Sequence, residues 1–72
     1  MITASEALEL IKTAKDNQDL NRLVGKVYDN AIQENGSRAK FARHLDDVRW
    51  YLAVPFDRAK QGAIEVLESY IN

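Results

Sequence analysis

His44 is the only histidine of the chain, and imidazole is the side chain that most readily exchanges a proton near neutral pH. Asp47 follows it at i+3, a spacing at which a carboxylate can orient an imidazole on a helix. Catalysis or metal binding needs further groups, but the chain has no cysteine and no second histidine. Its three serines, at positions 5, 37 and 69, each lie near an expected helix end. We therefore interpret His44 as a solvated surface residue.

The acidic pair Asp46 and Asp47 is the next candidate for chemistry. Neighbouring residues point in different directions on a helix, so these carboxylates do not form a pair that shares a proton. The sequence contains neither a glycine-rich phosphate loop nor a recognisable catalytic motif. It predicts a protein that is not an enzyme and that uses no cofactor or metal.

Trp50 is the residue that we single out for binding. It lies in the segment DDVRWYLAVPF, residues 46–56, for which two interpretations exist. On a strand, Trp50 joins a buried face through the alternation of Val48, Leu52 and Val54. On a helix, Trp50 lies about 180° from Phe41 and from the apolar stripe, by the 3.6-residue period.

The helical interpretation fits the flanking residues better. Its apolar residues recur at i, i+4, i+7 and i+11, as Phe41, Leu45, Val48 and Leu52. A hairpin over residues 38–54 would place Arg43 on the apolar face, and its turn at residues 46–47 would lack the glycine that favours a tight turn. We therefore favour a helix over residues 37–53, ended by Pro55, and keep an α+β domain with this hairpin as the alternative.

On the helical interpretation, Trp50 lies on the polar face of its helix. Its expected neighbours there are Ala39, Arg43, Asp46 and Val54. Tryptophan and arginine are enriched at the centres of protein interfaces, because one large side chain buries much area with few rotatable bonds. Trp50, Arg43 and Val54 are therefore the predicted protein-binding residues. The alternative is that Trp50 packs into the small core.

A basic stretch offers a second kind of partner. The segment SRAKFARHLDDVRWYLAVP resembles a helix-turn-helix, a fold whose second helix binds DNA, but it has Asp46 at the usual turn glycine and Asp47 at an apolar position. Four basic residues of this segment are available for contacts with phosphates: Arg38, Lys40, Arg43 and Arg49. A nucleic-acid-binding regulator using residues 38–60 is therefore the alternative function.

Length and composition favour a single domain over residues 1–72. The chain has 46% hydrophobic and 29% charged residues, which is a globular balance, and a net charge of −1. The charge is uneven, with −2 over residues 1–37, +3 over residues 38–60 and −2 beyond. Without cysteine, an apolar run of membrane length or a signal-peptide pattern, the chain is expected to be soluble and cytoplasmic.

The opening residues ITASEA, followed by a short charged helical chain, resemble the start of small accessory proteins encoded by tailed phages. This resemblance covers six residues and implies a protein that acts by binding a host or phage component. Together with the lack of catalytic groups, it leads us to expect a non-enzymatic interaction module. Its partner is expected to be another protein or a second copy of the chain, because a small core benefits from association.

The spacing of apolar residues predicts an all-α bundle of four short helices, over residues 4–15, 18–34, 37–53 and 57–71. The expected N-caps are Thr3, in a capping box with Glu6, followed by Asn17, Ser37 and Asp57. Asn and Gly in ENG, residues 34–36, provide a left-handed stop after the second helix.

The apolar face of the last helix is expected to include Tyr70. The predicted core consists of Leu8, Ile11, Leu20, Leu23, Val24, Val27, Phe41, Leu45, Val48, Leu52, Val66 and Leu67.

Overall fold

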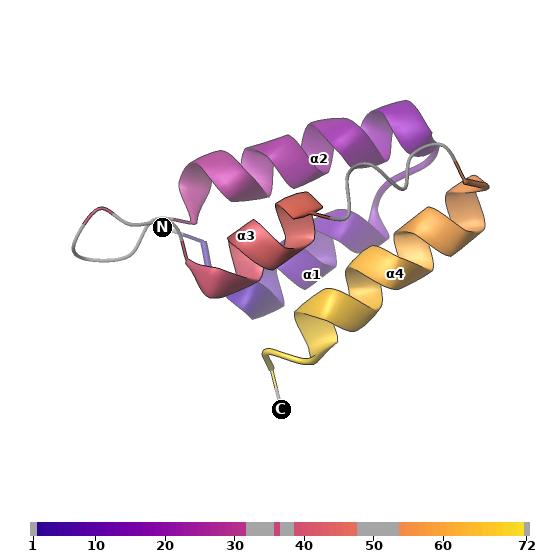
Figure 1. Cartoon of the computed structure of the whole chain (residues 1–72). Helices are drawn as coiled ribbons and strands as arrows, with labels where there is room; N and C mark the ends of the chain where they lie inside the picture. Colours follow the sequence, from indigo (N-terminus) through magenta and orange to yellow (C-terminus); the bar gives the residue numbers. More distant parts are fainter. Residues whose placement is uncertain (1, 32–35, 37–38, 48–53, 72) are drawn as a thin grey trace.

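The computed structural model describes residues 2–31, 36, 39–47 and 54–71. These residues form four helices: α1 (Ala4–Lys12), α2 (Asn17–Asn30), α3 (Lys40–Asp47) and α4 (Phe56–Glu68). Successive helices run in alternating directions, and α4 packs against α1 to close the bundle (Figure 1). The predicted all-α fold is confirmed. The alternative hairpin is wrong, because residues 40–47 are helical where it requires a strand and a turn.

Helix α1 begins with the predicted capping box. The Thr3 hydroxyl accepts from the Glu6 N–H at 3.2 Å, and the Glu6 carboxylate accepts from the Thr3 N–H at 3.0 Å. The helix ends at Lys12, three residues earlier than predicted. Beyond this end, the Ala14 carbonyl accepts a hydrogen bond of 3.0 Å from the Lys60 ammonium group of α4. A side chain distant in sequence thus satisfies a carbonyl that a longer helix would have used.

Helix α2 differs from its prediction at both ends. Its N-cap is Asp16 rather than Asn17, because the Asp16 carboxylate accepts from the Asp19 N–H at 2.7 Å. Asn17 is the first helical residue. The helix ends at Asn30 rather than at residue 34, since Ala31 leaves the helical conformation with ψ of 67°. The Ala31 carbonyl accepts from the Ala39 N–H at 2.8 Å, so pairing with the start of the α3 region replaces further helical turns.

Gly36 has the positive φ, 82°, that was expected for the stop in ENG. The other two residues of that stop lie outside the described residues. So do the predicted N-cap Ser37 and the predicted continuation of α3 from residue 48 to residue 53.

Helix α4 begins at Phe56, and the residue at its N-cap position is Pro55, which makes no side-chain capping bond. Asp57 was predicted as the cap but lies within the first turn. The backbone explains the difference, because Pro55 already has an extended conformation and its carbonyl accepts from the N–H groups of Arg58 and Ala59 at 3.1 Å each. The helix ends at Glu68 rather than at residue 71.

Most of the predicted core is confirmed. Eight predicted residues are buried: Leu8, Ile11, Leu20, Leu23, Val24, Val27, Leu45 and Leu67. Phe41 and Val66 are half-buried against the same cluster, whereas Val48 and Leu52 lie outside the described residues. The predicted core contained no alanine, whereas alanines provide seven of the fifteen buried apolar residues in the described part. None of the described helices is long and apolar enough to cross a membrane.

Candidate functional site

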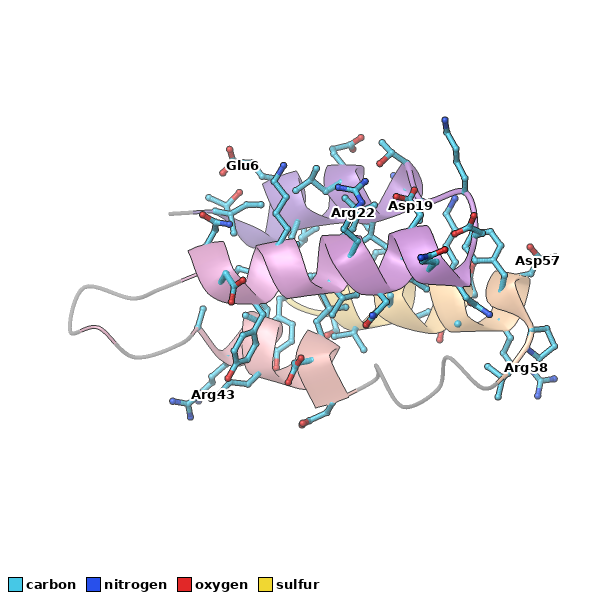
Figure 2. The ribbon with its side chains drawn as sticks, turned by 90° about the horizontal axis from the view of Figure 1, so that it is seen from above. Glu6, Asp19, Arg22, Arg43, Asp57 and Arg58 are labelled. Carbon is cyan, nitrogen blue, oxygen red and sulfur yellow. The ribbon has the colours of Figure 1, made fainter. Side chains whose placement is uncertain are left out.

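The predicted protein-binding residues are placed differently from one another. Arg43 is exposed on α3 and points away from the bundle (Figure 2). Val54 is half-buried against the core, and its carbonyl accepts from the Asn17 side-chain amide at 3.3 Å. Trp50 lies outside the described residues. Ala39, one of the neighbours expected on the polar face, is buried in a small cluster with Ala31 and Ala42. Among the described residues of this predicted set, Arg43 is thus the one whose side chain is exposed to a partner.

The predicted nucleic-acid-binding residues are described only in part. Lys40 and Arg43 are both exposed on α3, whereas Arg38 and Arg49 lie outside the described residues. Asp47, one helical turn beyond Arg43, is exposed too, so α3 presents both signs of charge. The described residues thus show two basic side chains next to an acidic one, rather than a continuous basic surface.

A different surface emerges where the end of α4 meets α3. The ring of Tyr70 lies 6.3 Å from that of Phe41 and 6.0 Å from that of His44, both in edge-on arrangements. The Tyr70 hydroxyl oxygen lies 3.4 Å from Nδ1 of His44. Ile71 directly follows Tyr70 and lies in the same turn. We call Phe41, His44, Tyr70 and Ile71 the end patch.

His44, Tyr70 and Ile71 of the end patch are exposed, and Phe41 is half-buried. Tyr70 and Ile71 are 42% and 41% exposed, and they are the exposed large apolar side chains of the described residues. The sequence predicted Tyr70 within a helix that continues to residue 71, and this extent is wrong. That helix ends at Glu68, and the N–H groups of Tyr70 and Ile71 bond to carbonyls three residues back, at 3.0 and 3.1 Å. Tyr70 therefore lies in a tighter turn beyond α4, where it contacts Phe41 and His44 of α3.

His44 is exposed, as predicted. Its described contact, however, is with Tyr70 on α4 rather than with Asp47 on its own helix. The signal for this contact in the sequence was weak. It consisted of an aromatic residue in the last turn of the helix expected over residues 57–71 and a preceding helix that was expected to run antiparallel to it.

Charges of opposite sign flank the end patch. Lys40 and Arg43 are exposed in the first half of α3, and Glu65 and Glu68 are exposed in the last turns of α4. Because α3 and α4 are antiparallel, the start of α3 and the end of α4 lie at the same end of the bundle (Figure 1). The patch therefore has an aromatic and apolar centre, with exposed basic residues at the start of α3 and exposed acidic residues at the end of α4.

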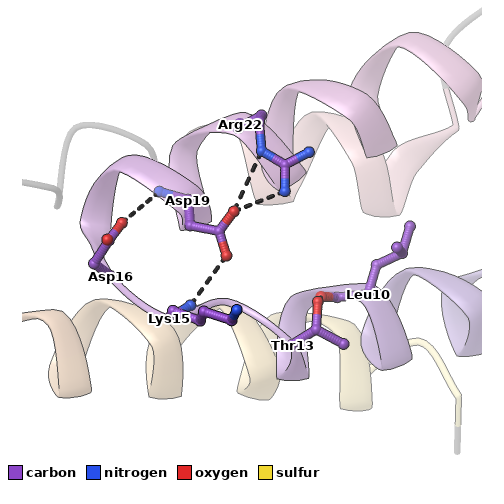
Figure 3. Close-up of polar contacts among 6 residues, drawn as sticks. All are labelled: Leu10, Thr13, Lys15, Asp16, Asp19 and Arg22. Carbon is purple, nitrogen blue, oxygen red and sulfur yellow. Dashed lines mark hydrogen bonds and ion pairs between the residues drawn. The ribbon is translucent and has the colours of Figure 1, made fainter.

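The corner between α1 and α2 contains a group of polar side chains that bond to one another and to the backbone (Figure 3). The Asp19 carboxylate accepts from Nε and Nη2 of Arg22 at 3.2 and 2.7 Å, and from the Lys15 N–H at 3.1 Å. The bonds from Arg22 and Lys15 hold the pKa of Asp19 below its usual 3.8. An open depression adjoins this corner and is lined by Thr13, Lys15, Asp16, Gln18, Asp19, Asn21 and Arg22. The Asp19 carboxylate is already bonded within the fold, so we interpret the corner as a structural link between α1 and α2.

Within the described residues, no three acidic or histidine side chains come together in a way that could hold a metal ion. Comparisons of the chain with models of protein families, with curated proteins and with solved structures found no match. The end patch, which the geometry itself identifies, is therefore the candidate functional site.

Proposed function

We propose that this chain is a small, non-enzymatic protein-interaction module that binds its partner through the end patch. The observation that carries the proposal is the exposure of Tyr70 and Ile71, at 42% and 41%, beside the half-buried ring of Phe41. Exposed aromatic and aliphatic side chains that stand together and are rimmed by charge are typical of interaction surfaces.

The contacts of Tyr70 support this role. Its ring is held edge-on by Phe41 and His44, so little side-chain entropy remains to be lost when a partner covers it. An aromatic side chain that is already ordered gives more net binding energy than a mobile one. Arg43, exposed on the same helix as His44, is proposed to extend this surface, and Trp50 stays a predicted contact residue.

The test is to remove the exposed side chains and measure retention of a partner. Immobilised wild-type chain is incubated with an extract of the source cells, and retained proteins are identified by mass spectrometry. A Tyr70→Ala/Ile71→Ala chain should lose about 2 kcal/mol of binding free energy, roughly 30-fold in affinity, which is the loss expected at the centre of an interface.

The matched control is Gln18→Ala/Lys26→Ala, which truncates two exposed side chains of α2. It should retain the same protein as the wild type, and circular dichroism should show unchanged helix content in both variants. Equal retention by both double variants would contradict the proposal.

A further inference from the structure

The composition of the core bears on what the end patch binds. Seven of the fifteen buried apolar residues in the described part are alanines, and the largest fully buried side chains are only Ile11, Leu45, Leu67 and Val27. In a chain of 72 residues, a core with this share of alanine has less apolar area in each buried side chain than a core of leucine or isoleucine. Small domains of this kind gain stability when association buries additional surface.

The charges that border the end patch have a self-complementary order. Lys40 is the first residue of α3 and directly precedes Phe41, whereas Glu68 is the last residue of α4 and precedes Tyr70 by two positions. The rings of Phe41 and Tyr70 are in contact, so these opposite charges lie on the two helices that the aromatic pair joins, at the same end of the bundle. Both side chains are exposed, and neither is in an ion pair within the described part of the chain.

We infer that the partner of the end patch is a second copy of this chain, in a twofold-symmetric dimer centred on Tyr70. In such an interface each contact occurs twice, because residue i of one copy meets residue j of the other and the reverse. A twofold axis at Tyr70 brings Lys40 of each copy opposite Glu68 of the other, while the Tyr70 and Ile71 side chains cover one another. This inference rests on the proposed function, since it names the partner of the same surface.

Charge reversal tests the inference. Sedimentation equilibrium of the wild type should show a monomer–dimer equilibrium that weakens as salt is added, because the paired charges are at the surface. Lys40→Glu alone should place acid opposite acid at both symmetric contacts, and Glu68→Lys alone should place base opposite base. Each variant should dimerise at least about tenfold more weakly than the wild type.

Mixing the two variants is the decisive measurement. In a mixed dimer, the glutamate introduced at position 40 faces the lysine introduced at position 68, and the two unaltered positions also present opposite charges. Equimolar Lys40→Glu and Glu68→Lys chains should therefore associate at least as tightly as the wild type, although neither dimerises well alone. The double variant Lys40→Glu/Glu68→Lys should regain dimerisation by the same pairing.

Unfolding cannot mimic this result. An acidic residue at the start of α3 and a basic residue at the end of α4 are the charges that the helix dipole favours at these positions. Each reversal should consequently leave the unfolding temperature of the monomer unchanged or raise it slightly.

Three outcomes would overturn the dimer: a wild type that stays monomeric at millimolar concentration, reversals that leave dimerisation unchanged, or mixed variants that do not associate. In each case the proposed function survives if the wild type retains a different protein from the extract and the Tyr70→Ala/Ile71→Ala chain does not. If that double variant retains every partner and also dimerises like the wild type, the proposed function fails together with the dimer.

Discussion

At the residue scale, Asp19 is held in place by several polar contacts. Its carboxylate accepts from Arg22 and from the Lys15 N–H, while its own N–H donates to the Asp16 carboxylate (Figure 3). These contacts join the end of the α1–α2 turn to the first turn of α2. The bonds from Arg22 and Lys15 favour the ionised form of Asp19, which makes the link sensitive to acid.

We therefore predict that Asp19 contributes to stability in a pH-dependent way. Its pKa is lowered in the folded state, first by Arg22 and then by the Lys15 N–H. A group with a lowered folded pKa contributes stability above its unfolded pKa and loses that contribution as pH falls through the folded value. Asp19→Asn should be less stable than the wild type at pH 7, and the difference should shrink as pH falls below the usual 3.8.

Urea unfolding at a series of pH values between 7 and 2 measures this difference. Arg22→Gln removes the largest cause of the lowered pKa, so its deficit relative to the wild type should shrink over the same acid range. A deficit of Asp19→Asn that stays constant across the range would show that ionisation of this carboxylate does not stabilise the fold.

At the element scale, a glycine inside a helix limits the stability of that helix, because glycine has a low helix propensity. Gly62 lies in the middle of α4, and a Cβ added there would meet nothing within 4 Å. Gly62→Ala should stabilise the protein by about 1 kcal/mol, because alanine loses less backbone entropy in a helix and no neighbour has to move. Thermal and urea unfolding would measure the gain.

Gly36 is the matched control for this substitution. It also has open space around it, but its φ is 82°, a conformation that an alanine adopts only with strain. Gly36→Ala should therefore destabilise the protein by roughly 1 kcal/mol. If the two substitutions changed stability in the same direction, backbone conformation would not be the cause.

At the scale of the whole molecule, α3 is tied to the bundle through a short buried stripe. Leu45 is fully buried within the main cluster and is one of the four largest fully buried side chains. Leu45→Ala should destabilise the fold by about 2 to 5 kcal/mol, through lost burial and the cavity that remains. Lys26→Ala, an exposed change on α2, should stay within about 0.5 kcal/mol when both are compared by urea unfolding.

The sequence alone determined the fold class, the number of helices, the capping box of Thr3 and Glu6, and most of the core. These features depend on residues within one or two helical turns of each other, so their spacing can be read directly from the sequence. The continuous stripe from Leu20 to Val27 is an example, since its period by itself identifies the buried side of α2.

Only the tertiary structure decided where the helices end and which side chains meet at the candidate site. Helix α2 ends where the Ala31 carbonyl bonds to the Ala39 N–H, and the carbonyl of Ala14 beyond α1 is capped by Lys60, 46 residues along the chain. The contact of His44 with Tyr70 spans 26 residues. A periodic pattern identifies the apolar face of each helix, but it does not contain the register between two helices. That register, fixed by packing across the bundle, brings Tyr70 to α3 and creates the end patch.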